Sequence, residues 1–227
     1  MKDDKLIRIA IDGPAAAGKS TVAKRLAETL SFVYIDTGAM YRAFTLHCLR
    51  NDISLTDEEA IISLLSETHI ALKQINQTQH VFLNDEDVTE IIRSNDVSRN
   101  VSHIAKIGAV REDMALRQRQ LAQHVNVIMD GRDIGTNVIP DAEVKMYLIA
   151  SVEERAQRRY DENIKKGIPT DLDELKTEIA ERDKRDMERE HSPLKRADDA
   201  IAIDTTSLSI DEVVAEIMTH VKKIKSS

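Results

Sequence analysis

A glycine-rich segment near the start of the chain has the residue types and spacing of a phosphate-binding loop. Its residues are Gly13, Pro14, Ala15, Ala16, Ala17, Gly18, Lys19, Ser20 and Thr21. They fit the pattern G-x-x-x-x-G-K-S/T, placed between an apolar run and a helical pattern. Consecutive N–H groups at such a helix start bind phosphate oxygens. We expect Lys19 to reach the β- and γ-phosphates of a nucleoside triphosphate. An ordinary glycine-rich turn is the alternative.

Two oxygen-bearing side chains are candidates for holding the Mg²⁺ that accompanies a triphosphate. Ser20 follows Lys19 directly, where this pattern places a metal-binding hydroxyl. Asp130 ends the apolar run 125–129, and its carboxylate could hold a water of the metal shell. An aspartate at the end of a strand can equally cap the following turn, so this alternative stays open for Asp130.

Arginine is the other residue type whose placement indicates chemistry. Arg42 and Arg132 come shortly after apolar runs, where open α/β sheets bind their ligands. Six more arginines lie in two charged helical patterns: Arg155, Arg158, Arg159, Arg182, Arg185 and Arg189. Because guanidinium groups bind phosphates through paired hydrogen bonds, the arginines predict that the acceptor is itself a phosphate. For the last three, a solvated helix face with ion pairs such as Arg182 with Asp186 stays open.

A phosphate acceptor also explains why no catalytic base is evident. A phosphate monoester has a second pKa of about 6 and is largely dianionic at neutral pH. Such a nucleophile needs positioning and charge neutralisation, whereas a hydroxyl acceptor needs a base. The chain has no Asn-Lys pair, so the guanine-reading motif of GTPases is excluded. A kinase for a sugar or shikimate-like hydroxyl and an ATP-gated regulatory module remain the alternatives.

Five short apolar runs must position these residues. They are residues 6–11, 32–35, 125–129, 144–149 and 200–203. Runs that are apolar nearly throughout are typical of parallel strands buried on both faces. Helical patterns lie between them, and Ser/Thr-x-x-Glu boxes at Thr56, Ser151 and Ser209 mark helix starts. The alternation predicts an α/β fold with a right-handed, doubly wound sheet.

Two segments interrupt this alternation. Residues 70–75 and 81–83 read as extended pieces joined through residues 76–78, which predicts a small antiparallel hairpin. Residues 163–175 are polar and lack apolar periodicity, which predicts a mobile loop between two charged helices.

The composition excludes several classes of protein. The 227 residues fit one large domain or one domain with an insertion. With 32 basic against 40 acidic residues the net charge is −8, which disfavours a polynucleotide-binding protein. The single cysteine, Cys48, excludes a disulfide framework and is expected to pack in the core. No apolar run approaches the about 18 residues of a membrane span. We expect a cytoplasmic protein that binds no membrane.

Four segments together resemble the bacterial cytidylate kinases: the glycine-rich loop and residues 36–42, 130–136 and 181–186. The resemblance extends over essentially the whole chain, and Asp-Gly-Arg-Asp at 130–133 is its most specific element. It implies a P-loop NTPase-type three-layer fold, with a five-stranded parallel sheet, an inserted small antiparallel substrate-side subdomain and a lid. It further implies one kinase domain over residues 1–227, with the insert at about 63–105 and the lid at about 155–175.

The resemblance also implies an activity: direct in-line transfer of the γ-phosphoryl group of ATP to CMP or dCMP, with Mg²⁺. The small-molecule nucleotides would be the only partners of a monomer. Lys19, Arg132, Arg155 and Arg159 would be catalytic, the last two closing over the γ-phosphoryl group. The expected substrate-binding residues are Ser102, Arg111 and Asp133 at the cytosine edge, Thr37, Asp186 and Arg189 at the sugar, Arg42, Arg132 and Arg182 at the phosphate, and Tyr41.

Overall fold

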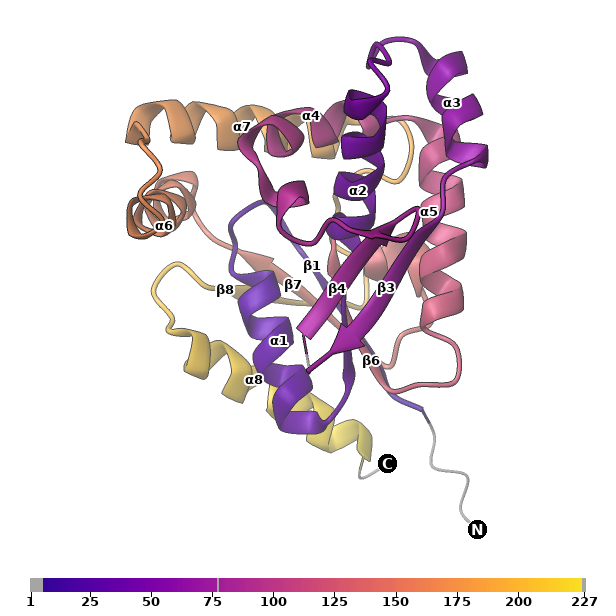
Figure 1. The fold of residues 1–227 in the computed structure, drawn as a ribbon. Helices are drawn as coiled ribbons and strands as arrows, with labels where there is room; N and C mark the ends of the chain where they lie inside the picture. The colour runs from indigo at the N-terminus through magenta and orange to yellow at the C-terminus, as the bar shows by residue number, and fades with distance from the viewer. Residues whose placement is uncertain (1–5, 77, 226–227) are drawn as a thin grey trace. The chain divides into compact units, whose positions relative to one another are not determined.

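The computed structural model describes residues 6–76 and 78–225 (Figure 1). Its chain divides into two compact units. Unit 1 comprises Met1–Tyr34 and Ala122–Ser227, and unit 2 comprises Ile35–Leu121. None of the helices within the described residues is long and apolar enough to cross a membrane.

The main sheet has five strands in the order β2-β6-β1-β7-β8. Their bounds are Val33–Asp36 for β2, Val127–Gly131 for β6, Arg8–Asp12 for β1, Val144–Ile149 for β7 and Ile201–Asp204 for β8. Strand β1 pairs in parallel with both β6 and β7, and β7 pairs in parallel with β8. Each predicted apolar run forms a strand within two residues of its expected bounds. The predicted α/β fold with a five-stranded parallel sheet is confirmed.

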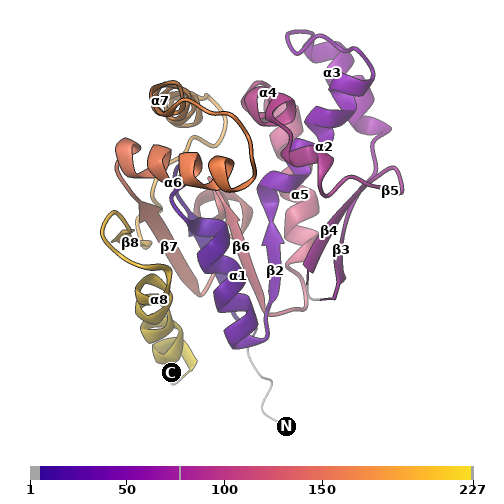
Figure 2. The same ribbon diagram turned by 60° about the vertical axis from the view of Figure 1, so that its left-hand side comes forward.

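Four α-helices and one short π-helical segment complete unit 1. They are α1 (Lys19–Leu30), η2 (Ile134–Val138), α6 (Val152–Lys165), α7 (Leu172–Glu188) and α8 (Ile210–Lys225). Helices α1 and α8 lie side by side on one face of the sheet (Figure 2). Leu26 of α1 and Ile217 of α8 are fully buried in one apolar cluster with Ile9 and Ile128 of the sheet. This core fixes where α1 begins, and therefore where the glycine-rich loop lies.

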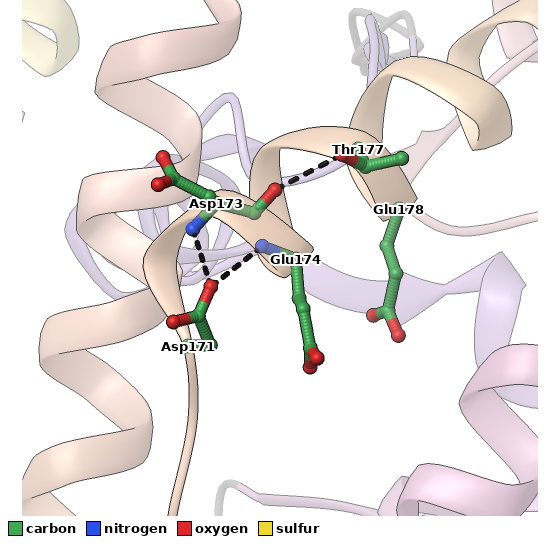
Figure 3. Close-up of a pocket in the computed structure, with 5 residues that line it drawn as sticks. All are labelled: Asp171, Asp173, Glu174, Thr177 and Glu178. Atoms are coloured by element: carbon green, nitrogen blue, oxygen red, sulfur yellow. Dashed lines mark hydrogen bonds between the residues drawn. The ribbon is translucent and has the colours of Figure 1, made fainter.

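The loop predicted over residues 163–175 is shorter than expected, because α6 continues through Lys165 and α7 begins at Leu172. The carboxylate of Asp171 caps α7 by accepting the N–H groups of Asp173 and Glu174, both at 2.9 Å (Figure 3). Leu175 packs with Ala156 of α6 in a small apolar cluster. A cap and one apolar contact thus extend the helices into a segment whose overall composition is polar.

Unit 2 contains four α-helices, a 3₁₀ turn and a small sheet. The helical elements are α2 (Thr37–Arg50), α3 (Glu58–Ser66), η1 (Ile91–Arg93), α4 (Asn95–Ala105) and α5 (Gly108–Leu121). The strands are β3 (Ile70–Ile75), β4 (Thr78–Leu83) and β5 (Glu86–Asp87), in the order β3-β4-β5. Strands β3 and β4 pair antiparallel, so the predicted hairpin is confirmed. In its expected turn, Gln77 lies outside the described residues.

The helix caps follow two of the three predicted boxes. Ser151 caps α6 by accepting the N–H of Glu154, and Ser209 exchanges hydrogen bonds with Glu212 at the start of α8. The prediction for Thr56 is wrong, because Asp57 accepts the N–H of Ala60 and α3 begins one residue later.

The core of unit 2 forms around α2. Phe44 and Met40 are buried there against apolar residues of α3, the small sheet and α5. Cys48 is fully buried in the same cluster, and burial raises the pKa of its thiol to about 11. Its predicted role as a packing residue is confirmed.

Candidate active site

The glycine-rich loop connects β1 to α1 through backbone angles that favour glycine. Gly13 has φ of 147°, and a Cβ there would lie 2.1 Å from the carbonyl oxygen of Leu148. Gly18 has φ of 86° and is the N-cap residue of α1. Ala16 also adopts a positive φ, 60°. The loop is therefore a backbone cradle held against β7, and only glycine fits at its first position.

No side chain among the described residues caps the start of α1. The first intrahelical hydrogen bond runs from the N–H of Val22 to the carbonyl of Gly18. The N–H groups of the first turn are thus available to an anion at the positive end of the helix. The amine of Lys19 is buried and donates to the carbonyl of Pro14 at 2.7 Å. Burial chiefly, and then the nearby Arg132, lower the pKa of Lys19 to about 7.

Ser20 and Asp130 lie together beside the loop. The Ser20 hydroxyl donates to Oδ2 of Asp130 at 2.8 Å, and the hydroxyl of Tyr34 donates to Oδ1 at 2.7 Å. Asp130 is buried, whereas Ser20 is exposed at the beginning of α1. A hydroxyl and a carboxylate are hard oxygen ligands of the kind that Mg²⁺ prefers. The donor set therefore fits the ion that the sequence predicts.

Four of the residues predicted to bind the phosphoryl acceptor lie close together within unit 1. Arg132 donates from Nε to Oδ2 of Asp186 at 3.0 Å. Arg189 lies 3.6 Å from Oδ1 of Asp186 and 3.7 Å from Oδ1 of Asp133. Its guanidinium also donates twice to the carbonyl of Ser192, at 2.8 and 2.6 Å. Two buried carboxylates thus hold two guanidinium groups in one cluster, which we call the Asp186 cluster.

The fifth predicted residue in this region, Arg182, lies on α7 and acts electrostatically on the same carboxylate. Burial alone would raise the pKa of Asp186, but the guanidinium groups of Arg132, Arg182 and Arg189 lower it below its usual value. The expectation that Arg189 continues the helical face is wrong. Helix α7 ends at Glu188, and Arg189 is extended. The chain then turns back, because the N–H of Leu194 donates to the carbonyl of Asp186.

The two expected lid arginines differ in their surroundings. Arg155 is 4% exposed and pairs with Asp183 of α7 at 2.6 Å. It also donates to the carbonyl of Ala15 in the glycine-rich loop at 3.1 Å and to that of Ala150 at 2.9 Å. Arg159 lies on the exposed side of α6, 3.5 Å from Glu162. The structure brings Arg155 to the loop and leaves Arg159 at the surface of the helix.

In unit 2, Asp36 organises the start of α2. Its Oδ1 accepts the N–H of Ala39 at 3.0 Å, and its Oδ2 accepts Nη2 of Arg42 at 2.7 Å. Arg93 lies 3.5 Å from the same oxygen. Burial would raise the pKa of Asp36, but these two arginines lower it. Thr37, which begins α2, is buried beside this carboxylate.

The remaining predicted residues of unit 2 lie on three helices. Tyr41 of α2 and Arg111 of α5 are brought together, with the guanidinium 5.4 Å from the centre of the ring. Arg111 is 3% exposed and donates to the carbonyl of Ala105, the last residue of α4. Ser102 is buried on α4. A buried cation stacked on an aromatic ring is a rigid group suited to base recognition.

Sequence reasoning missed the roles of several residues that support the site. Tyr34 lies in the predicted apolar run 32–35 and Asp183 in the segment 181–186, but neither was expected to bind a site residue, and their partners lie 96 and 28 positions away in the chain. The capping role of Asp36 could have been predicted, because Asp36 follows an apolar run and precedes a helix start. Such an aspartate is a typical N-cap.

These features define a nucleotide-binding protein of the P-loop kinase class. They are strand β1, the uncapped helix α1, the loop between them with Lys19, and the Ser20–Asp130 pair. Residues 9–223 match the family model described as Cytidylate kinase. A solved structure of an uncharacterized protein from Eubacterium ventriosum has a TM-score of 0.52 at 13% identity, covering 96% of this chain and 99% of its own. At that identity it shows the fold alone.

Two sequence relatives are much closer. A Cytidylate kinase of Anoxybacillus flavithermus is 61% identical over 220 residues, which cover 97% of this chain and 98% of the relative. A Cytidylate kinase of a Geobacillus species is 63% identical over 217 residues, covering 96% and 97%. The chain belongs to the cytidylate kinase family.

Proposed function

We propose that this chain transfers the γ-phosphoryl group of ATP to CMP or dCMP, giving ADP and the nucleoside diphosphate. Family membership supports the reaction. The observation that carries the proposal is the Asp186 cluster, in which Arg132 and Arg189 are held together in the same compact unit as the phosphate-binding loop. Arg132 and Arg182 both act on the carboxylate of Asp186, and two guanidinium groups near one point are suited to a second phosphate, while Arg189 would face the sugar.

The donor triphosphate would bind the N–H groups of residues 13–21, with Lys19 at its β- and γ-phosphates. Ser20 and Asp130 would hold Mg²⁺, which neutralises phosphate charge and orients the oxygens. Arg155 and Arg159 would neutralise the transferring group. The burial of Arg155 against Ala15 supports its assignment, while that of Arg159 requires movement of its side chain.

For the acceptor, Arg42, Arg132 and Arg182 would hold the phosphate, which then attacks in line without a general base. Thr37, Asp186 and Arg189 would contact the sugar. A further set would read or line the base: Tyr41, Ser102, Arg111 and Asp133. A carboxylate accepting from the exocyclic amine favours cytosine, since uracil presents an acceptor there.

The organisation, oligomeric state and location of the chain complete the proposal. The chain acts as one kinase domain and as a monomer in the cytoplasm, with an insert at about residues 63–105 and a lid at about 155–175.

Transfer to a nucleotide in preference to water requires a dry site. We therefore expect residues 163–175 to gain amide-exchange protection when ATP and CMP are both bound. Equal protection without nucleotides would count against the lid.

The deciding experiment is a coupled ADP-release assay with CMP, dCMP, UMP, AMP and GMP as acceptors, and with ATP alone as the background. CMP or dCMP should give the highest kcat/KM. Preferred turnover of AMP or GMP would reject the base assignment. Activity on shikimate or a sugar, but on no monophosphate, would favour a hydroxyl kinase. ATP binding without any turnover would favour a regulatory module.

A further inference from the structure

Asp12 is a buried carboxylate that the proposed reaction does not use. It ends β1 and directly precedes Gly13, the first residue of the phosphate-binding loop. It is 4% exposed, so the loss of hydration must be offset by hydrogen bonds. Its side chain makes these bonds to a segment more than 120 residues further along the chain.

Both oxygens of Asp12 accept backbone N–H groups that directly follow Asp133. Oδ1 accepts from Ile134 at 2.8 Å, and Oδ2 accepts from Gly135 at 2.7 Å. These two residues begin the π-helical segment η2, whose N-cap residue, Asp133, makes no side-chain capping bond. Asp12 therefore supplies the anion that would otherwise come from a local cap.

Gly135 lies close to the carboxylate of Asp12. A Cβ on Gly135 would lie 3.4 Å from Oδ2 of Asp12 and 3.2 Å from Cδ of Lys145. The backbone of η2 is thus held close to the end of β1. Burial raises the pKa of Asp12 to about 6, while the two N–H groups act in the opposite direction and favour its ionised form.

The segment held by Asp12 carries two of the proposed acceptor residues. Arg132 and Asp133 lie immediately before Ile134, and on their other side they contact Asp186 and Arg189. We infer that Asp12 is a positioning residue, which fixes the acceptor-binding segment 132–135 relative to the phosphate-binding loop. The inference rests on the proposed function, because it assigns the acceptor to Arg132 and Asp133.

The test is the Asp12→Asn variant, which keeps the size of the side chain and turns one acceptor into a donor facing an N–H group. Losing one charged hydrogen bond and leaving a buried group unpaired should raise the KM for CMP roughly tenfold to a hundredfold. The KM for ATP should change far less. Asp57→Asn is the matched control, since Asp57 also accepts a backbone N–H at a helix start, far from these residues in the chain.

Equal rises in the two KM values, or an unchanged KM for CMP, would overturn the inference. If Asp12→Asn does not fold, Asp12→Glu provides the second variant, because its longer side chain keeps the charge but displaces the oxygens. It should show the same preferential effect on CMP. Failure of both variants to fold would assign Asp12 a purely structural role and overturn the inference. Wild-type protein inactive on CMP would instead reject the proposed function itself.

Discussion

The phosphate-binding loop and the Asp186 cluster bind anions, by our proposal, in two different ways. The loop uses consecutive backbone groups, and its shape depends on angles at residues such as Gly13 and Gly18. The Asp186 cluster uses side chains from separate parts of the chain, held by carboxylates. A site built from backbone is specified locally, whereas a site built from ion pairs depends on the packing of several elements.

Unit 2 repeats the second arrangement on a smaller scale. Asp36 holds Arg42 at 2.7 Å and lies 3.5 Å from Arg93. Its carboxylate thus orients both arginines. Paired arginines lose less side-chain entropy on binding, so the carboxylates act as pre-organising groups. The phosphate-binding loop and the Asp186 cluster should therefore respond differently to substitution.

The largest effect is expected from Lys19→Ala in the loop. Removing the cation that would contact the β- and γ-phosphates should lower kcat by roughly a hundredfold to a thousandfold. Turnover at saturating CMP, measured by ADP release, checks this. Lys222→Ala, on the exposed side of α8, is the control and should retain wild-type activity. A loss for Lys19→Ala no greater than that of the control would contradict the assignment.

The next effect is expected from Asp133→Ala, which concerns recognition and not transfer. The KM for CMP should rise about tenfold to a hundredfold, because a charged hydrogen-bond acceptor is lost. The preference for CMP over UMP should shrink, while the KM for ATP stays close to wild type. Steady-state kinetics with both pyrimidine nucleotides measure the two quantities. If CMP kinetics are unchanged, Asp133 does not read the base.

The difference between the two regions also explains what could be predicted from the sequence. The loop, the strand before it and the helix after it are contiguous, so residues 13–21 carry nearly all the information about their own structure. The five strands were predictable for the same reason, since continuous apolar runs mark strands buried on both faces.

The ion pairs were less predictable, because they depend on where helices end and how they pack. Arg189 follows Arg182 and Arg185 at helical spacing, and the nearest proline, Pro193, lies four residues beyond it. Only the tertiary structure shows that Arg189 leaves the helix and reaches Asp133. The Tyr34–Asp130 bond joins residues far apart in the chain, and neither residue indicates the other.

A smaller effect is expected from Asp186→Asn, which removes the charge at the centre of the cluster. The KM for CMP should rise about tenfold, because Arg132 and Arg189 lose the partner that orients them. Asp173→Asn on the same helix is the matched control, since Asp173 is exposed and pairs only with Lys176 among the ion pairs described. Equal KM values for the two variants would show that the cluster does not depend on this carboxylate.

Wild type and Asp186→Asn together test how the stability contributed by Asp186 depends on pH. The pKa of Asp186 is lower in the folded chain than the about 3.9 of an unfolded aspartate. The group therefore stabilises the fold above that value, and its contribution is lost as the pH falls through the folded pKa. Urea unfolding at pH 7 and below pH 4 should show a larger loss for wild type than for Asp186→Asn. Parallel losses would contradict the prediction.

The smallest effect is expected from Ala16→Gly in the loop. Ala16 has φ of 60°, an angle that costs a residue with a Cβ roughly 1 kcal/mol. Glycine relieves this strain but gains entropy in the unfolded chain, by about 0.4–1 kcal/mol. The two contributions nearly cancel, so the free energy of unfolding and the KM for ATP should both stay close to wild type. Thermal unfolding and ATP titration measure them.

Gly13→Ala is the informative partner of this variant. It adds one Cβ to the loop, whereas Ala16→Gly removes one. The added Cβ would lie 2.1 Å from the carbonyl oxygen of Leu148, so the loop must move away from β7 and the KM for ATP should rise. If the loop binds phosphate through its backbone, the two substitutions must differ in this way. A large rise in the KM for ATP in Ala16→Gly would mean that the alanine side chain itself supports the loop, and the contrast with the Asp186 cluster would then fail.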